Sequence, residues 1–172
     1  TPIDLAKECI DKTFEIIGKE NITEIIEPSA GNGSFSNQIA NCIAYDLVPE
    51  SDNIKAADFL DIKLGYKSGR LFIGNPPFGV HNKLVVDFYD KCCECGDYIA
   101  FILPISCYKN DIKLYKFDLI YSEDLGLKYY TDRELHCCFN IYKRPNSGIF
   151  NPKPNYELNE ITIIEHRRKN GD

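Results

Sequence analysis

The sequence predicts an α/β fold in which helices cover both faces of a mainly parallel β-sheet. Short apolar, β-branched runs that are typical of buried strands alternate with stretches of helical periodicity. A glycine-rich turn follows the first of these runs, and polar side chains stand where later runs end. Ligands of such sheets bind beyond the carboxyl ends of the strands, so the same pattern predicts where a site lies.

The predicted elements follow one another along the chain in this order. Apolar residues at helical spacing after Thr1-Pro2 predict an amphipathic helix up to Ile17, with Gly18 near its end. A helix is expected to begin over Phe35–Ala40, and a short element to end at Phe59. Another helix is predicted by the spacing of Leu84, Val85, Phe88, Tyr89 and Cys92. The predicted strands are Ile22–Ile26, Cys42–Tyr45, Leu71–Ile73 and Tyr98–Leu103.

The last third of the chain has a different pattern. Alternating stretches at Phe117–Tyr121 and Cys137–Tyr142 predict an antiparallel hairpin. Residues 146–155 are rich in Pro, Asn and Gly and predict a loop or linker, and Tyr156–Glu165 is expected to form a last strand. We therefore expect one domain over residues 1–145, followed by a loop and C-terminal extension over residues 146–172.

Composition is that of a single soluble globular domain, with 172 residues, 44% hydrophobic and 27% charged. No run of about 18 apolar residues predicts a transmembrane helix, and the first residues do not resemble a signal peptide. Eight cysteines without a regular spacing favour a reducing compartment over a disulfide framework. We expect an intracellular, cytoplasmic protein without membrane partners. Its richness in Ile, Asn, Lys and Tyr hints at an AT-rich viral or microbial genome, so the nucleoid or a host cell is the alternative location.

Two cysteine clusters raise the question of a zinc site. They are Cys92-Cys93-Glu94-Cys95, with one C-x-x-C, and Cys137-Cys138. The first falls on a predicted helix and the second on a predicted strand, where free Cys behaves as a small apolar residue. We therefore predict no metal site.

A net charge of −6 argues against a broad nucleic-acid surface. This net charge still permits a local basic rim, and scattered solvated charges are the alternative. An acidic catalytic core could also bind nucleic acid through a partner or another domain. The candidate rims are Lys109, Lys113 and Lys116, then Lys143-Arg144, then Arg167-Arg168-Lys169.

The glycine-rich turn has the sequence Glu27-Pro28-Ser29-Ala30-Gly31-Asn32-Gly33-Ser34-Phe35. Glycines let the backbone approach a ligand closely, and G-x-G alone would also fit a dinucleotide. The third glycine position holds Ser36, however, and the strand ends in Glu-Pro. A carboxylate there can neutralise an ammonium, which favours the amino-acid end of S-adenosylmethionine over a pyrophosphate.

Further acidic residues follow the glycine-rich turn. Asp46 ends the next strand, where an acid typically holds ribose hydroxyls; a solvated strand-end Asp is the alternative. Asp58 could accept a hydrogen bond from the cofactor's adenine amine, with Phe59 packed on that ring, although Asp-Phe alone is nearly uninformative.

The strongest signal is Gly74-Asn75-Pro76-Pro77-Phe78-Gly79. An exocyclic amine such as N6 of adenine is a poor nucleophile, because its lone pair is delocalised into the ring. The Asn75 side-chain carbonyl and the Pro76 backbone carbonyl can accept both amine hydrogens and favour a pyramidal nitrogen. Pro76 and Pro77 fix φ and offer no N–H, which preorganises the loop. A rigid turn is the structural alternative.

A base inside a duplex must be flipped out to reach such a loop. Phe78 then offers an aromatic ring for stacking on one face of the base, and Phe139 is the candidate for the opposite face. An equally good interpretation of Phe139 is an aromatic residue of a strand in the core. No general base is required, and His81, His136 and His166 form no evident catalytic set.

Over residues 1–144 the sequence resembles the N6-adenine methyltransferases in which the cofactor motif precedes the Asn-Pro-Pro-Phe loop (gamma-type order). The matching segments are Thr1-Pro2, the Glu27–Phe35 motif, Asp46, Asp58-Phe59, Asn75–Phe78 and Leu103-Pro104-x-Ser106. The resemblance implies a Rossmann-like class I methyltransferase fold, with a seven-stranded, mostly parallel sheet and an antiparallel last strand. It also implies that S-adenosylmethionine is the cofactor, that the first four segments and Asn75 bind it, and that a nucleic acid is the substrate, with DNA favoured over RNA.

One departure from that family concerns target recognition. Gamma-type DNA enzymes usually carry a sizeable recognition domain after the core, whereas few residues follow Arg144 here. We expect a partner subunit or a missing domain, or a protein similar to the small ribosomal RNA adenine methyltransferases. Two other readings stay open: a protein-glutamine N5 methyltransferase, which generally has Tyr where Phe78 stands, and a non-catalytic methyltransferase-like subunit.

Overall fold

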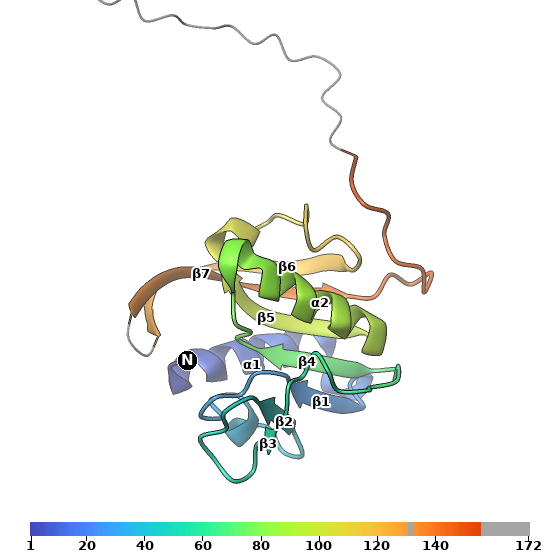
Figure 1. Cartoon of the computed structure of the whole chain (residues 1–172). Helices are drawn as coiled ribbons and strands as arrows, with labels where there is room; N and C mark the ends of the chain where they lie inside the picture. The colour runs from blue at the N-terminus through green and yellow to red at the C-terminus, as the bar shows by residue number, and fades with distance from the viewer. Residues whose placement is uncertain (131–132, 156–172) are drawn as a thin grey trace, which may run out of the picture.

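Seven strands form one mixed sheet in the computed structural model, which describes residues 1–130 and 133–155 (Figure 1). The strand order is β3-β2-β1-β4-β5-β7-β6. The strands are β1 (Glu24–Glu27), β2 (Ile43–Asp46), β3 (Lys55–Ala56), β4 (Arg70–Gly74), β5 (Tyr98–Pro104), β6 (Asp118–Tyr130) and β7 (Arg133–Lys143). The two α-helices of the described residues are α1 (Ile3–Ile17) and α2 (Lys83–Cys95).

The direction of the strands agrees with the prediction. Strands β3, β2, β1, β4 and β5 run parallel to one another, and β7 runs antiparallel to both β5 and β6. The central strand β4 is buried along its whole length, which explains why Leu71–Ile73 reads as a continuous apolar run. The mostly parallel, seven-stranded sheet with an antiparallel last strand is thus confirmed.

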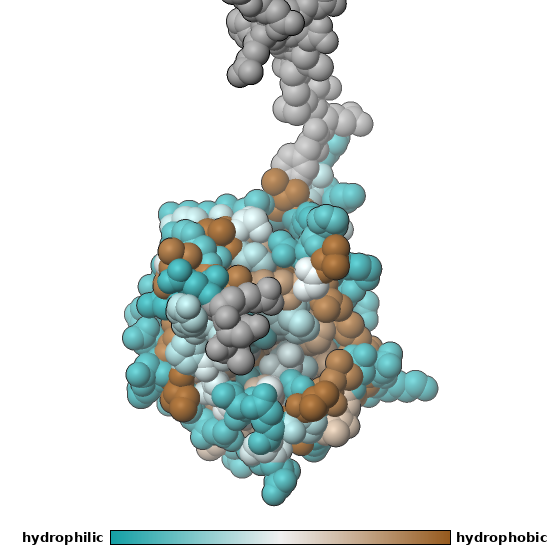
Figure 2. Space-filling model, turned by 60° about the vertical axis from the view of Figure 1, so that its left-hand side comes forward, coloured by the Kyte–Doolittle hydropathy of each residue, from teal (hydrophilic) through white to brown (hydrophobic). Residues whose placement is uncertain are grey.

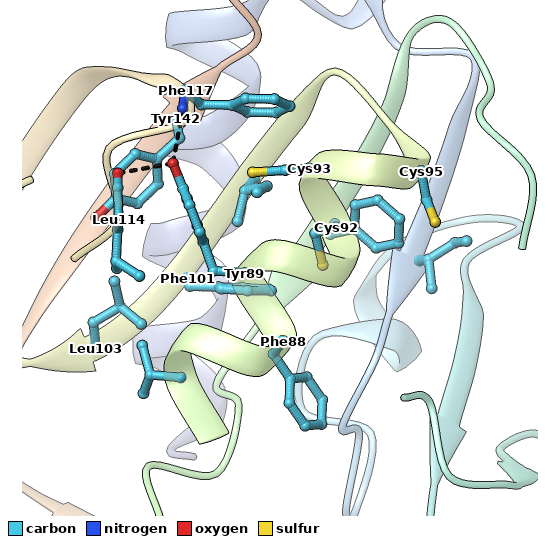
Figure 3. Packing of buried hydrophobic residues seen from close by; sticks show 14 of the residues in the cluster. Phe88, Tyr89, Cys92, Cys93, Cys95, Phe101, Leu103, Leu114, Phe117 and Tyr142 are labelled. Atoms are coloured by element: carbon cyan, nitrogen blue, oxygen red, sulfur yellow. Dashed lines mark hydrogen bonds between the residues drawn. The ribbon is translucent and has the colours of Figure 1, made fainter. Parts of the chain in front are cut away.

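The helices lie on opposite faces of the sheet (Figure 1). Helix α1 buries its apolar stripe, including Leu5, Cys9 and Ile10, and ends at Gly18, whose φ of 81° suits glycine. Helix α2 packs on the other face against side chains of β5 such as Phe101 and Leu103 (Figure 3). The predicted helices at both positions are confirmed.

A buried hydrogen-bonded tyrosine anchors the chain after β5 to α2 (Figure 3). The Tyr89 hydroxyl donates to the Leu114 carbonyl at 2.8 Å and accepts from the Phe117 N–H at 2.9 Å. Both backbone groups are buried, so this bridge replaces the water that they lose and fixes the loop between β5 and β6.

The two cysteine clusters lie where the sequence places them, on α2 and β7, and their cysteines are buried and free. Burial raises the pKa of the Cys42 and Cys138 thiols to about 12, which makes them unreactive small apolar groups. Within the described ranges no group of three or more His, Cys, Asp or Glu side chains is arranged to hold a metal ion.

The structure differs from the prediction in the segment after the glycine-rich turn. The helix expected over Phe35–Ala40 is only a short 3₁₀ turn, Ser36–Gln38. Ser36 and Asn37 stand near the start of this segment, and side chains of these types compete with the helical backbone; Asn37 bonds back to the Asn32 carbonyl at 3.2 Å.

The predicted hairpin exists and is longer than expected. Pro104, the last residue of β5, pairs with Cys137, so the tip of β6 and β7 extends beyond the end of β5 (Figure 1). Residues 144–155 contain no helix or strand, as predicted for the start of the loop. The strand predicted at Tyr156–Glu165 and the basic cluster at Arg167–Lys169 lie outside the described residues.

No helix within the described ranges is long and apolar enough to cross a membrane. The face shown in Figure 2 is mostly hydrophilic, with apolar side chains in small separate patches.

Candidate active site

A cavity of about 310 Å³ lies where β1, β2 and β4 end. Each of these parallel strands passes into a loop at this edge of the sheet, so the backbone groups and polar side chains of several loops meet there. Predicted site residues that line it are Thr1, Glu27, Ser29, Ala30, Gly31, Asp46, Asn75 and Pro77, and the unpredicted ones are Asn32, Ser34 and Glu50. The structure therefore brings the glycine-rich turn, the strand-end acids and the Asn-Pro-Pro loop into one site.

The glycine-rich turn presents bare backbone to this cavity. Gly31 has φ 54°, and a Cβ there would meet nothing within 4 Å, so the space above it is open to a ligand. Its N–H donates to Asp46 Oδ2 at 2.7 Å, and Ala30 N–H donates to the Tyr45 carbonyl at 2.9 Å. The turn is thereby fixed to the end of β2.

Asp46 accepts a backbone hydrogen bond on each carboxylate oxygen. Oδ1 accepts the Val48 N–H at 2.9 Å, while Oδ2 accepts from Gly31. An ionised carboxylate has about four acceptor positions, so Asp46 can still accept hydroxyl hydrogens from a ligand in the cavity.

Glu27 is the buried acid of the site, with 2% of its surface exposed. Its Oε2 accepts the Ser36 N–H at 2.8 Å. Burial raises the pKa of the Glu27 carboxyl to about 7. Gly74 adjoins it, because a Cβ on Gly74 would lie 3.3 Å from Glu27 Cγ. A buried carboxylate in this state is stabilised by a ligand that brings a positive charge.

Asn75 stands at the edge of the cavity next to the N-terminal segment. Its Nδ2 donates to Thr1 Oγ1 at 3.1 Å, which turns the side-chain carbonyl away from Thr1. Within residues 1–130 and 133–155 no donor contacts Asn75 Oδ1, so this oxygen is available as an acceptor. Pro76 is buried and Pro77 exposed, and Phe78 is half-buried against both halves of the core.

The N-terminal segment is tied to the glycine-rich turn as well. Ser34 Oγ donates to the Thr1 carbonyl at 2.7 Å, and Gln38 Nε2 bonds to the Ile3 carbonyl at 3.1 Å. Pro2 precedes α1 and contributes its carbonyl to Ala6 N–H at 3.0 Å without lining the cavity. Thr1 thus contacts both the turn and the Asn-Pro-Pro loop.

Phe59 is not positioned as predicted. It is 1% exposed, and its ring packs against Phe72 and Phe88 at centroid distances of 5.7 and 5.6 Å. A side chain enclosed by core rings offers no face to a cofactor. Asp58 does not line the cavity; its Oδ1 accepts the Leu60 N–H at 2.9 Å and closes a turn, so its adenine contact stays a prediction.

Phe139 is a core residue and not a wall of the acceptor site. It pairs with Ile102 in the middle of the sheet and is 1% exposed under α1. The stacking role predicted for it is therefore wrong, and the strand-core alternative fits. Phe35, also 1% exposed, anchors the glycine-rich turn in the same cluster, and Pro28 and Gly33 shape the turn without lining the cavity.

The lining residues that were not predicted differ in whether the sequence contains a signal for them. Asn32 and Ser34 occupy the variable positions around Gly33, so their place in a tight turn was a usable signal. Glu50 enters from the loop after β2 because its N–H donates to the Gly31 carbonyl at 3.1 Å, and nothing in the local sequence marks it.

Comparison with known proteins gave similarity at the level of structure alone. No protein-family model matches the chain, and no curated protein matches it. A protein of Pyrococcus horikoshii, provisionally described as an RNA methyltransferase, superposes with a TM-score of 0.63 at 16% identity, covering 84% of this chain and 85% of that one. The chain has the class I methyltransferase fold.

Two further methyltransferase structures agree with this fold. A protein of Listeria monocytogenes, provisionally described as a class I S-adenosylmethionine-dependent methyltransferase, has a TM-score of 0.60 at 13% identity, covering 90% of this chain and 63% of that one. The 23S rRNA methyltransferase ErmE has a TM-score of 0.55 at 14% identity, covering 81% and 68%.

The residues of the cavity fit S-adenosylmethionine. Glu27 would offer a buried carboxylate to the ammonium, Asp46 would offer acceptors to ribose hydroxyls, and the open backbone at Gly31 would permit close approach. The volume lies at the lower end of the range for ligand pockets, about 300–1,000 Å³.

Proposed function

We propose that this protein transfers a methyl group from S-adenosylmethionine to N6 of adenine in a nucleic acid. The observation that carries the proposal is Asn75, whose side-chain oxygen is left free as an acceptor beside the cavity that holds Glu27 and Asp46. An acceptor oxygen next to a methyl-donor site suits an amine that must be oriented before it attacks.

The chain's own groups act on the amine. Asn75 Oδ1 and the Pro76 carbonyl each accept one N6 hydrogen, which withdraws the lone pair from the ring and aims it at the methyl group. S-adenosylmethionine supplies an electrophilic methyl group when bound. The N–C bond forms as the C–S bond breaks, and the extra proton then leaves the nitrogen to water, so no side-chain base is required.

Access for the base follows from the same loop. An adenine in a duplex must be flipped out to reach Asn75, and the half-buried ring of Phe78 lies three residues along the loop. Stacking of a base on an aromatic ring contributes about 1–3 kcal/mol. With Phe139 in the core, Phe78 is the single ring that we propose for this contact.

The proposal is tested by supplying labelled S-adenosylmethionine with duplex DNA, single-stranded DNA, structured RNA and a glutamine-containing peptide. We expect label on a nucleic acid and loss of transfer in Asn75→Ala. The matched control is Asn146→Ala, which changes an exposed loop asparagine. Label on the peptide alone would instead indicate a protein-glutamine methyltransferase. Cofactor binding without transfer to any polymer would indicate dependence on a partner, and absence of both would exclude the enzyme.

A further inference from the structure

A second cavity of about 220 Å³ lies between the start of α2 and the chain that follows β5. It shares no lining residue with the first cavity. The lining residues used below are Asn82, Val86, Ser106, Asn110, Ile112 and Lys113.

This cavity and the cofactor site are lined by opposite ends of one connection, Asn82 for this cavity and Asn75 for the cofactor site. The loop leaves β4 at Asn75, and the same connection ends at Asn82, whose Nδ2 donates to Ser106 Oγ at 3.3 Å. One short connection therefore contributes residues to both cavities.

The polar groups of the cavity leave a donor and an acceptor side by side. Asn110 uses its amide within its own loop, donating to the Ser106 carbonyl at 3.1 Å and accepting the Ile112 N–H at 3.0 Å. Within the described part of the chain, Asn82 Oδ1 has no donor. The Ser106 hydroxyl accepts from Asn82 Nδ2 and has the Cys107 thiol as its other partner. Sulfur is a weak acceptor, so the acceptor group of a ligand can replace it. A neighbouring donor and acceptor match the edge of a nucleobase, and Val86 and Ile112 offer apolar surface to its face.

Lys113 is the lysine that lines this cavity. Lys83 pairs with Asp87 and Lys116 with Asp90, whereas Lys113 has no carboxylate within ion-pair distance among residues 1–130 and 133–155. Lys109, four residues earlier, lies over the ring of Tyr108 at 5.1 Å and also has no carboxylate partner in those ranges. In a chain of net charge −6 these two cations form a local basic rim. Such a rim attracts anionic groups, among them the phosphates of a nucleic acid.

We propose that this cavity binds a nucleobase adjacent in the acceptor strand to the methylated adenine, with its phosphate on Lys113. The proposal rests on the proposed function, because it assigns a second subsite to the same acceptor. Ser106 and Asn82 contact the edge of the base, Val86 and Ile112 contact its face, and the catalytic loop receives the neighbouring nucleotide.

The test compares binding and turnover of short single-stranded oligonucleotides with an adenine flanked by a normal or an abasic nucleotide. In the unaltered protein, one abasic flank should raise KM and the dissociation constant about tenfold, with kcat within twofold. In the double variant Ser106→Ala/Lys113→Glu, KM for the intact strand should already be raised. Replacing the flanking nucleotide by an abasic one should then cause no further rise in KM. The control is Lys63→Glu, an exposed lysine away from the cavity. Ile112→Trp, which fills the cavity from its rim, should reproduce the loss, and thermal unfolding shows whether each variant folds.

The outcomes separate this inference from the proposed function. If oligonucleotides are methylated and the flank has no effect, or the variants keep the original KM, the subsite is refuted and the function stands. If no nucleic acid is methylated but the oligonucleotide binds and the same variants weaken its binding, the subsite stands and the function falls. Binding of a peptide in place of the oligonucleotide would overturn both.

Discussion

Asn75 Nδ2 lies 3.1 Å from Thr1 Oγ1, so a residue just before α1 orients the amide that we propose as acceptor of the substrate amine. The same residue's carbonyl accepts the Ser34 hydroxyl of the glycine-rich turn. The N-terminal segment therefore joins the two loops on which methyl transfer depends, and a change at Thr1 should affect catalysis as well as cofactor binding.

Thr1→Val removes the hydroxyl and keeps the shape of the side chain. Loss of one hydrogen bond, about 0.5–1.5 kcal/mol, frees the Asn75 amide to rotate, so kcat should fall up to about tenfold with little change in the acceptor KM. Single-turnover kinetics at saturating cofactor measure this effect. Thr1→Ser keeps the hydroxyl and should retain the rate; an unchanged kcat in Thr1→Val would show that Thr1 does not orient Asn75.

Glu27→Gln removes the buried charge while an amide oxygen can still accept the Ser36 N–H. A hydrogen bond to a charged group contributes about 1.5–3 kcal/mol, so cofactor affinity should fall roughly 10- to 100-fold. Titration calorimetry with S-adenosylhomocysteine measures it. The control is Glu50→Gln, an exposed acid of the same cavity, which should change affinity little. An equal loss of cofactor affinity in both variants would show that Glu27 does not bind the ammonium group.

Cofactor affinity should depend on pH through Glu27. Burial raises the pKa of its carboxyl to about 7, and only the ionised form pairs with an ammonium. Affinity should therefore weaken as pH falls from 7.5 to 5.5. The Glu27→Gln variant should show a flat profile over this range, and a parallel decline in both proteins would place the titration elsewhere.

The cofactor-free protein should show the opposite trend in stability. A carboxyl whose pKa is raised on folding binds its proton more tightly in the folded state, so the free energy of unfolding falls as pH rises from about 4.5 to about 7. The loss is at most about 3 kcal/mol, and Glu27→Gln should lack it. Urea unfolding at pH 5 and pH 7 measures the difference between the two proteins, and equal slopes would contradict the burial of this charge.

Gly31→Ala should separate backbone strain from loss of ligand space. Alanine at φ 54° costs about 1 kcal/mol of stability, and its methyl group enters the cavity and should reduce cofactor affinity by at least tenfold. Gly148→Ala is the matched control, because Gly148 has φ 74° with nothing within 4 Å and lies far along the chain in a surface loop. The control should lose a similar amount of stability and keep its cofactor affinity. Retained cofactor affinity in Gly31→Ala would show that the cofactor does not bind against Gly31.

Residues at strand ends were predictable because position and chemistry agree in sequence. Glu27, Asp46 and Asn75 each follow an apolar run, and parallel strands bring such ends to one edge. The positions of the aromatic side chains were not predictable in this way, because the burial of a ring depends on neighbours from distant segments. Phe59 is enclosed by Phe72 and Phe88, and no local pattern distinguishes that from a ring open to a ligand.

The second cavity also had no sequence signature. It depends on a contact between the segment before α2 and the segment after β5, made by Asn82 and Ser106. Only the lysines of the later segment were visible in the sequence, as a candidate basic rim. Their placement needed the fold, because the Tyr89 bridge that fixes this loop joins groups far apart in the chain.

The central claim is tested most directly by the chemical identity of the product. Nucleic acid treated with the protein and labelled S-adenosylmethionine would be digested to nucleosides and separated by mass spectrometry. We expect the label in N6-methyladenine nucleoside, with none formed by Asn75→Ala that still binds cofactor. Label in another nucleoside, or unchanged N6-methyladenine in the Asn75→Ala digest, would contradict the account.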